Sequence, residues 1–190
     1  MVDKILLQNI LKIECHRYFD NSWRDYNKIN KKIRTKTIIN MLSAYLHRGK
    51  EVLLLMDNGS FKHKMNVGNY ENVTISNEMK RFMNNSNSTF TAFHNHPKEG
   101  SFSLGDLEQI IIYDKIQLLV LCTNSCRYCA ALYKPRSFTE KEIKAILTLF
   151  DSFKEKNNVD GHCNAKYFIQ QLQEKGRLFY YETIISRNLE

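Results

Sequence analysis

The sequence predicts an α/β fold in which a mixed β-sheet is flanked by helices. Apolar runs of strand length, at 51–57, 88–96 and 116–123, are interspersed with longer segments that have helical spacing of apolar residues. The run 126–134 follows the third of these across a short turn at Asn124-Ser125, so the two should pair as antiparallel strands. Strands mixed with helices in this order favour a sheet covered by helices over an all-α or all-β fold.

The composition is that of one compact domain, to which terminal helices can be appended. The chain has 190 residues, of which 43% are hydrophobic and 25% charged, close to globular averages. No stretch of about 18 apolar residues is present, which argues against a membrane partner. Five cysteines, an odd number in a chain without an export signal, argue against a disulfide framework. We therefore expect a soluble, cytoplasmic protein, and the sequence does not define its oligomeric state.

The first part of the chain should form two helices and then a β-hairpin. Helices are expected over 3–18 and about 35–48, and the second should end at Gly49, where glycine favours helix termination. The run 51–57 is a strand, and Asn58-Gly59 is a strong signal for a hairpin turn into the residues that follow.

The rest of the chain should alternate helices and strands. Ser76 is suited to cap a helix because its hydroxyl can accept a hydrogen bond from a free N–H of the first turn. The expected elements are a short strand at 72–76, a helix over 77–84, the strand 88–96, a helix over 104–114, the strands 116–123 and 126–134, and helices over 138–156 and 164–175. The sequence gives no clear assignment for 178–190.

Positive charge is concentrated near the N-terminus. Of the formal net charge of +8, most lies in residues 1–50, which carry 11 Lys and Arg against 4 Asp and Glu. The densest stretch, 24–36, could contact nucleic acid or another acidic partner. The simpler interpretation is a solvated basic helix or loop.

Two histidines and an aspartate form a candidate metal site. His94 and His96 are two residues apart at the end of an expected strand, so both imidazoles should point to the same face at the rim of the sheet. Ser103 is suited to begin the next helix, which places Asp106 in its first turn, near the same rim. Two imidazoles and one carboxylate can bind zinc and leave a fourth position for water, which is the arrangement of a catalytic zinc site.

The segments His94-Asn95-His96-Pro97 and Ser103-Leu104-Gly105-Asp106 resemble the signature of the JAB/MPN (JAMM) metalloprotease family, with the asparagine typical of its bacterial RadC-like branch. The resemblance covers about residues 38–135. It implies a cytidine-deaminase-like JAB/MPN fold and a zinc ion held by His94, His96 and Asp106. By the same likeness, Glu51, which opens an apolar strand, is the general base and acid, and Ser103 stabilises the oxyanion. The six residues between His96 and Ser103 are one fewer than is usual in the family.

These likenesses divide the chain into a basic N-terminal helical extension (1–37), a JAB/MPN catalytic core (38–135) and a C-terminal helical segment packing on the core (136–190). The resemblance implies a metallopeptidase that cleaves a peptide or isopeptide bond, plausibly at the C-terminal tail of a ubiquitin-like protein. Two alternatives are a RadC-like nucleic-acid-associated protein that grips phosphates through residues 24–36, and a non-catalytic MPN scaffold.

Three cysteines have a spacing that needs a separate interpretation. Cys122, Cys126 and Cys129 are spaced as in radical-SAM iron–sulfur motifs, but only 61 residues follow Cys129, too few for the barrel that such chemistry uses. A structural zinc shared with His162 or Cys163 would need a ligand from a distant segment. Buried or half-buried thiols on strands are the favoured interpretation.

Overall fold

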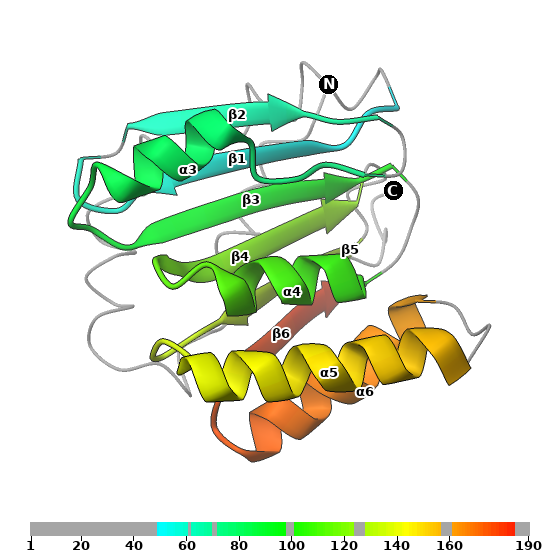
Figure 1. The fold of residues 1–190 in the computed structure, drawn as a ribbon. Coiled ribbons are helices and arrows are strands. Elements are labelled where there is room, and N and C mark those ends of the chain that lie inside the picture. The colour runs from blue at the N-terminus through cyan, green and yellow to red at the C-terminus, as the bar shows by residue number, and fades with distance from the viewer. Residues whose placement is uncertain are drawn as a thin grey trace.

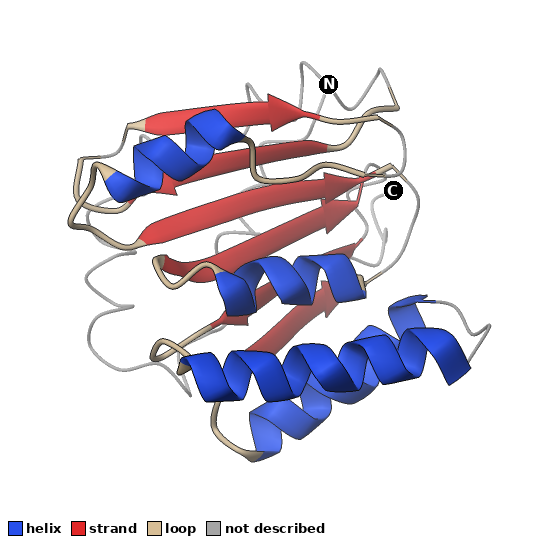
Figure 2. Ribbon diagram, in the orientation of Figure 1, coloured by secondary structure: helices blue, strands red, loops and turns tan. Residues whose placement is uncertain are grey.

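The computed structural model describes residues 49–60, 62–69, 72–97, 101–123, 128–156 and 161–184. Six strands form one sheet in the order β2-β1-β3-β4-β5-β6, and the helices lie beside it (Figures 1 and 2). The elements are β1 (Val52–Asp57), β2 (His63–Val67), α3 (Asn77–Asn84), β3 (Phe90–His96), α4 (Leu104–Ile112), β4 (Ile116–Thr123), β5 (Tyr128–Tyr133), α5 (Glu140–Lys156), α6 (Gly161–Glu174) and β6 (Phe179–Ile184).

The sheet is mixed, and its strand directions bring three chain segments to one edge. β3 and β4 are parallel and are joined through α4, whereas every other neighbouring pair is antiparallel. Because β1 runs against β3, the start of β1 lies beside the end of β3, and Leu53 pairs with His94. The chain leaves β3 at this edge and α4 begins there, so the start of β1, the end of β3 and the first turn of α4 are neighbours (Figure 1).

The main core lies between one face of the sheet and the helices. Alternate residues of the central strands point into it, such as Leu53 and Leu55 of β1 and Phe90 and Ala92 of β3. Residues of the opposite row, including Phe93, are also buried. This burial on both faces explains why these strands are continuous apolar runs in the sequence.

Both ends of α4 are fixed by polar contacts. At its start Ser103 is the N-cap and forms a reciprocal capping box with Asp106. At its end the Nζ of Lys134, which is only 2% exposed, donates to the carbonyl oxygens of Ile110 (2.8 Å) and Tyr113 (2.9 Å). Burial lowers the pKa of this amine to about 8, against the opposing effect of Asp114. The first turn of α4 therefore has a defined position over the edge of the sheet.

The predicted α/β class with a mixed sheet and flanking helices is confirmed. The hairpin at Asn58-Gly59 forms, the predicted strand 116–123 is observed with the same bounds, and its antiparallel partner is β5. Ser76 caps α3 by accepting a hydrogen bond from the Met79 N–H. The helices predicted over 3–18 and 35–48, the extension 1–37 and the basic stretch 24–36 lie outside the described residues.

Two other expectations differ from the structure. The strand predicted at 72–76 is wrong, since these residues are irregular and two of their carbonyls accept from side chains instead of a neighbouring strand. Asn66 Nδ2 donates to the carbonyl oxygen of Thr74 (2.7 Å), and Gln109 Nε2 to that of Val73 (3.5 Å).

The C-terminal segment 136–190 was expected to be helical, with its last residues unassigned. The structure forms α5 and α6 there but adds β6, which pairs with β5. Phe150, Phe168 and Leu178 belong to the same core cluster as the sheet residues. The segment therefore contributes a strand to the sheet and side chains to the core, in addition to its two helices.

No helix in the described ranges is long and apolar enough to cross a membrane.

Candidate metal centre

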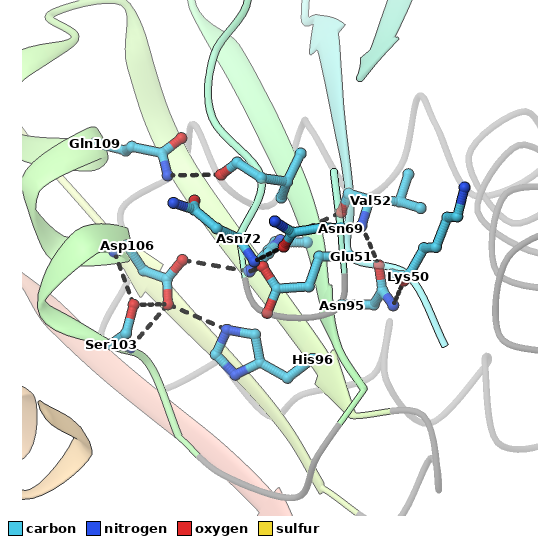
Figure 3. Close-up of polar contacts among 12 residues, drawn as sticks. Lys50, Glu51, Val52, Asn69, Asn72, Asn95, His96, Ser103, Asp106 and Gln109 are labelled. Atoms are coloured by element: carbon cyan, nitrogen blue, oxygen red, sulfur yellow. Dashed lines mark hydrogen bonds and ion pairs between the residues drawn. The ribbon is translucent and has the colours of Figure 1, made fainter. Parts of the chain in front are cut away.

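Four buried polar side chains meet where β1 begins, β3 ends and α4 begins, and Figure 3 labels Glu51, His96 and Asp106 among them. Glu51 immediately precedes β1, His94 and His96 end β3, and Asp106 is in the first turn of α4. Their side chains are between 3% and 10% exposed. Ionisable groups are rarely buried to this extent without close partners, so the contacts among these four residues decide what the cluster can do.

The two histidines lie on the helix-facing row of β3. His94 and His96 continue the alternation of Phe90 and Ala92, and their rings are 4.7 Å apart at an interplanar angle of 86°. The Nδ1 of His94 lies 3.2 Å from the carbonyl oxygen of Val52. Because a carbonyl can only accept, Nδ1 is the donor of this hydrogen bond.

His94 is therefore held as a neutral ring with a lone pair on Nε2. Burial lowers the pKa of His94 below its ordinary value, and the nearby Asp106 carboxylate only partly opposes this effect. A neutral imidazole with its proton on Nδ1 has an unprotonated Nε2. A hydrogen bond from the second ring nitrogen to a backbone carbonyl is the usual way in which proteins orient a histidine that binds metal.

Asp106 is oriented by its role in the capping box. Its Oδ2 accepts hydrogen bonds from the backbone N–H (2.7 Å) and the hydroxyl (2.8 Å) of Ser103. Oδ1 lies 3.4 Å from Nε2 of His94, and Oδ2 lies 3.3 Å from Nε2 of His96. Burial acts to raise the pKa of Asp106, but the two imidazoles and the Ser103 N–H outweigh it and hold the pKa below its usual value. The carboxylate is thus an anion at neutral pH.

Glu51 approaches the same imidazole nitrogen from β1. Its Oε2 lies 3.8 Å from Nε2 of His94. One potential ligand atom from each of Glu51, His94 and His96 lies within 4.8 Å of the others, which marks these three residues as a group that could hold a metal ion. Glu51 and Asp106 therefore both approach the unprotonated nitrogen of His94.

The donor set fits a divalent cation. Nε2 of His94 lies 3.4 Å from Oδ1 of Asp106 and 3.8 Å from Oε2 of Glu51, so two carboxylates approach one imidazole nitrogen, and a positive charge at this point stabilises both. Imidazole nitrogens together with carboxylate oxygens suit zinc and other divalent transition metals. The group that could hold a metal ion contains two of the three ligands expected from the sequence, His94 and His96, and its third member is Glu51. The expected ligand Asp106 lies beside this group and contacts both imidazoles.

Ser103 lies at the site, with its hydroxyl engaged by Asp106. The hydroxyl donates to Oδ2 of Asp106 and accepts from the Asp106 backbone N–H at 3.2 Å. Its capping role is thus observed, and its expected role towards an oxyanion stays a prediction. Residues 98–100 of the shortened loop lie outside the described residues.

The sequence analysis missed Asn95, which stands between the two histidines. Asn95 is 1% exposed, and its carboxamide bonds to backbone atoms on both sides of Glu51. Its signal was weak, because an asparagine within an apolar strand could equally have pointed outward as an edge residue. Of the three cysteines, Cys122 of β4 pairs with Asn95 and lies opposite Cys129 of β5, and Cys126 is outside the described residues.

Comparisons with protein families, with curated proteins and with solved structures found no match for this chain. The class of site is therefore defined by its own geometry: a buried cluster of two histidines and two carboxylates at a sheet edge, able to hold a divalent metal ion. Any more specific activity is a matter for proposal.

Proposed function

We propose that this protein is a zinc-dependent metallopeptidase of the JAMM type. Its substrate would be a peptide or isopeptide bond, plausibly at the C-terminal tail of a ubiquitin-like protein. The observation that carries the proposal is the convergence of Asp106 and Glu51 on Nε2 of the buried His94, beside His96.

The proposal assigns His94, His96 and Asp106 to hold the zinc ion. Two of the three are held by hydrogen bonds: His94 by the Val52 carbonyl, and Asp106 by two donors of Ser103. A bound zinc ion would supply Lewis acidity, which lowers the pKa of a water molecule and polarises a carbonyl group. Preformed ligands reduce the conformational entropy lost when the metal binds.

Glu51 would move the protons. A carboxylate beside the metal ligands can take a proton from the attacking water and later deliver it to the departing amine nitrogen, as a general base and then a general acid. Both proton positions must be within its reach, and Glu51 is buried at the edge of the cluster, 3.8 Å from His94 Nε2. This reaction balances without a cofactor other than the metal, because one water molecule is consumed and one peptide bond is broken.

Ser103 would support the negative charge that develops on the carbonyl oxygen. Its hydroxyl would have to turn from Asp106 towards the substrate to do so. Asp106 would still accept the backbone N–H of Ser103 at 2.7 Å, so the aspartate would keep its orientation during this change. A donor placed for the developing charge typically contributes about 10²–10³-fold to the rate.

The test is the metal content and cleavage activity of the wild-type protein beside two variants. In the double variant His94→Ala/His96→Ala both imidazoles are lost, whereas His63→Ala removes an exposed histidine of β2 as a matched control. We expect about one zinc per chain in the wild type and in His63→Ala, together with cleavage of some member of a panel of tagged ubiquitin-like fusions. The double variant should lose both.

A wild-type protein that binds no zinc, or one that cleaves equally well after both histidines are replaced, would contradict the proposal. If the wild type binds zinc, the double variant loses it and no fusion is cleaved, the result would support the metal site and contradict the proposed ubiquitin-like substrate.

A further inference from the structure

Asn95 has an unusual place for a carboxamide, because it is buried in the strand that carries both histidines. Its exposure is 1%, and its side chain forms two hydrogen bonds with the backbone of the segment that leads into β1. Oδ1 accepts from the backbone N–H of Val52 at 2.7 Å, and Nδ2 donates to the carbonyl oxygen of Lys50 at 3.0 Å (Figure 3). The two backbone partners are the residues immediately before and after Glu51.

These bonds lie where the ladder between β1 and β3 stops. The last paired residues at this edge are Leu53 and His94, so regular strand pairing does not extend to Glu51. The carboxamide of Asn95 replaces the missing ladder bonds, since it offers one acceptor and one donor as a strand backbone does. It thereby ties the segment 50–52 to β3 at the position of the metal ligands.

The other side of the segment is held by the chain that follows β2. The backbone N–H of Glu51 donates to the carbonyl of Asn69 at 2.8 Å, and the N–H of Gly68 donates to the carbonyl of Glu51 at 2.9 Å. A side chain at Gly68 would collide with the backbone of Asn72, since a Cβ would lie 1.9 Å from its carbonyl oxygen. The close packing here requires glycine, and it leaves little room for the Glu51 backbone to shift.

The two hydrogen bonds from Asn95 to the backbone of Lys50 and Val52 form a clamp around Glu51. Val52 also connects this clamp to the proposed metal ligands. Its N–H donates to Asn95 and its carbonyl accepts from His94 Nδ1 at 3.2 Å. The same peptide segment therefore sets the orientation of His94 and the position of Glu51. A shift of residues 50–52 would change the distance between the Glu51 carboxylate and the imidazole.

We infer that Asn95 is a positioning residue: its carboxamide holds the backbone on both sides of Glu51 and so fixes the Glu51 carboxylate relative to His94, His96 and Asp106. The catalytic consequence rests on the proposed peptidase function, whereas the clamp itself does not. A misplacement of about 1 Å of a catalytic group can reduce the rate of an enzyme by about 100-fold.

The test compares two replacements of Asn95 with a control in the same strand. Asn95→Leu removes both hydrogen bonds at similar volume, and Asn95→Asp keeps an acceptor for Val52 but no donor for Lys50. Thr91→Val is the control, because Thr91 is also fully buried in β3 and its hydroxyl donates to Asn58 Oδ1 at 2.9 Å, at the other end of the strand. For each protein we would measure folding, zinc content, kcat and KM, and hydrogen exchange of the Glu51 and Val52 amides.

The inference expects a loss in kcat without a loss of metal. In Asn95→Leu kcat should fall about 10–100-fold with KM within about two-fold and zinc content unchanged, and Asn95→Asp should lie between it and the wild type. The amides of Glu51 and Val52 should exchange faster in both Asn95 variants than in Thr91→Val. If Asn95→Leu does not fold, the kcat, zinc content and amide exchange of Asn95→Asp test the inference on their own.

Several results would overturn the inference. One is an unchanged kcat in the Asn95 variants. Another is a fall in kcat that is proportional to a loss of zinc. The third is a fall in the kcat of Thr91→Val as large as that in the Asn95 variants. If the wild-type protein cleaves nothing, the proposed function fails, and amide exchange then decides the clamp by itself: unchanged exchange at Glu51 and Val52 in folded Asn95 variants would refute it.

Discussion

The two ends of β1 each carry a buried carboxylate, and the two carboxylates have different kinds of neighbours. Glu51 at the start is 8% exposed and Asp57 at the end is 4% exposed. Asp57 accepts hydrogen bonds from the backbone N–H groups of Gly59 (2.8 Å) and Ser60 (2.9 Å) and from the Ser86 hydroxyl (2.5 Å). Glu51 instead faces the unprotonated nitrogen of His94, which Asp106 faces as well.

Burial alone therefore does not distinguish a functional carboxylate from a structural one. Around Asp57 every contact named above is with a donor, and the result is a well-satisfied hairpin turn. Glu51 and Asp106 instead both approach Nε2 of His94, at 3.8 and 3.4 Å, and two carboxylates at one imidazole nitrogen favour a bound cation. The chemical nature of the neighbours, more than the exposed area, separates the two ends.

The strongest test of this comparison exchanges each carboxylate for its amide. Glu51→Gln should reduce kcat by about 10²–10⁴-fold, the usual contribution of general acid–base catalysis, because an amide cannot carry the proton. The proposed role of Glu51 as a proton carrier predicts that zinc content stays near that of the wild type, whereas a loss of zinc would make Glu51 a ligand, as its place in the metal-binding group allows. Asp57→Asn is the matched control and should keep kcat within a few-fold. Full turnover by Glu51→Gln with zinc bound would show that the roles are wrongly assigned.

A second test measures which end of β1 is stabilised when a metal ion binds. Zinc at about 1,000 times its Kd should raise the free energy of unfolding by about 4 kcal/mol if it binds the folded chain alone, and a chelator should reverse the effect. The gain should persist in Asp57→Asn and vanish in His94→Ala. It would be measured by denaturant unfolding with and without added zinc. Equal stabilisation of both variants would place the metal elsewhere.

The third test concerns the stability of the hairpin end. Asp57→Asn should lower the free energy of unfolding by about 1–3 kcal/mol, because the charge-assisted bonds from Ser86 and the turn N–H groups weaken. Urea unfolding of the metal-free protein measures the difference. Ser86→Ala should give a smaller loss in the same direction. No loss in either variant would mean that the turn does not depend on this carboxylate.

The smallest expected effect is the response of this end to acid. Burial acts to raise the pKa of Asp57, but hydrogen bonds from Ser86, Ser60 and Gly59 outweigh it and lower the pKa below its ordinary value of 3.8. A lowered folded-state pKa means that Asp57 contributes stability above pH 3.8, and this contribution is lost as the pH falls through the folded-state pKa. Stability measured between pH 5 and pH 2 should therefore fall less steeply in Asp57→Asn. Parallel curves for the two proteins would contradict this.

The sequence predicted the elements whose signals are local. His94 and His96 could be placed on one face because strand alternation is strict, and Asp106 could be placed near them because Ser103 is a good N-cap. Glu51 was assigned by resemblance, and the antiparallel pairing of β1 with β3 explains how it reaches the histidines.

The features that the sequence did not predict depend on contacts between distant segments. Asn95 bonds to residues 43 and 45 positions away, which no local pattern encodes. Residues 72–76 have the composition of a strand, but their carbonyls are used by Asn66 and Gln109. β6 could be recognised only once β5 was known to offer it an edge.

The loop before Ser103 rests on the last strand of the sheet. Phe102 is fully buried, its ring centroid lies 6.4 Å from that of Tyr180 in β6, and the hydroxyl of Ser101 lies 3.4 Å from that of Tyr180. Since β6 is synthesised after all the other described elements, a growing chain has its histidines early but receives the support beneath Ser103 last. The last strand to be made thus supports the residues next to Ser103, so the N-terminal turn of α4 takes its final position only after β6 has joined the sheet.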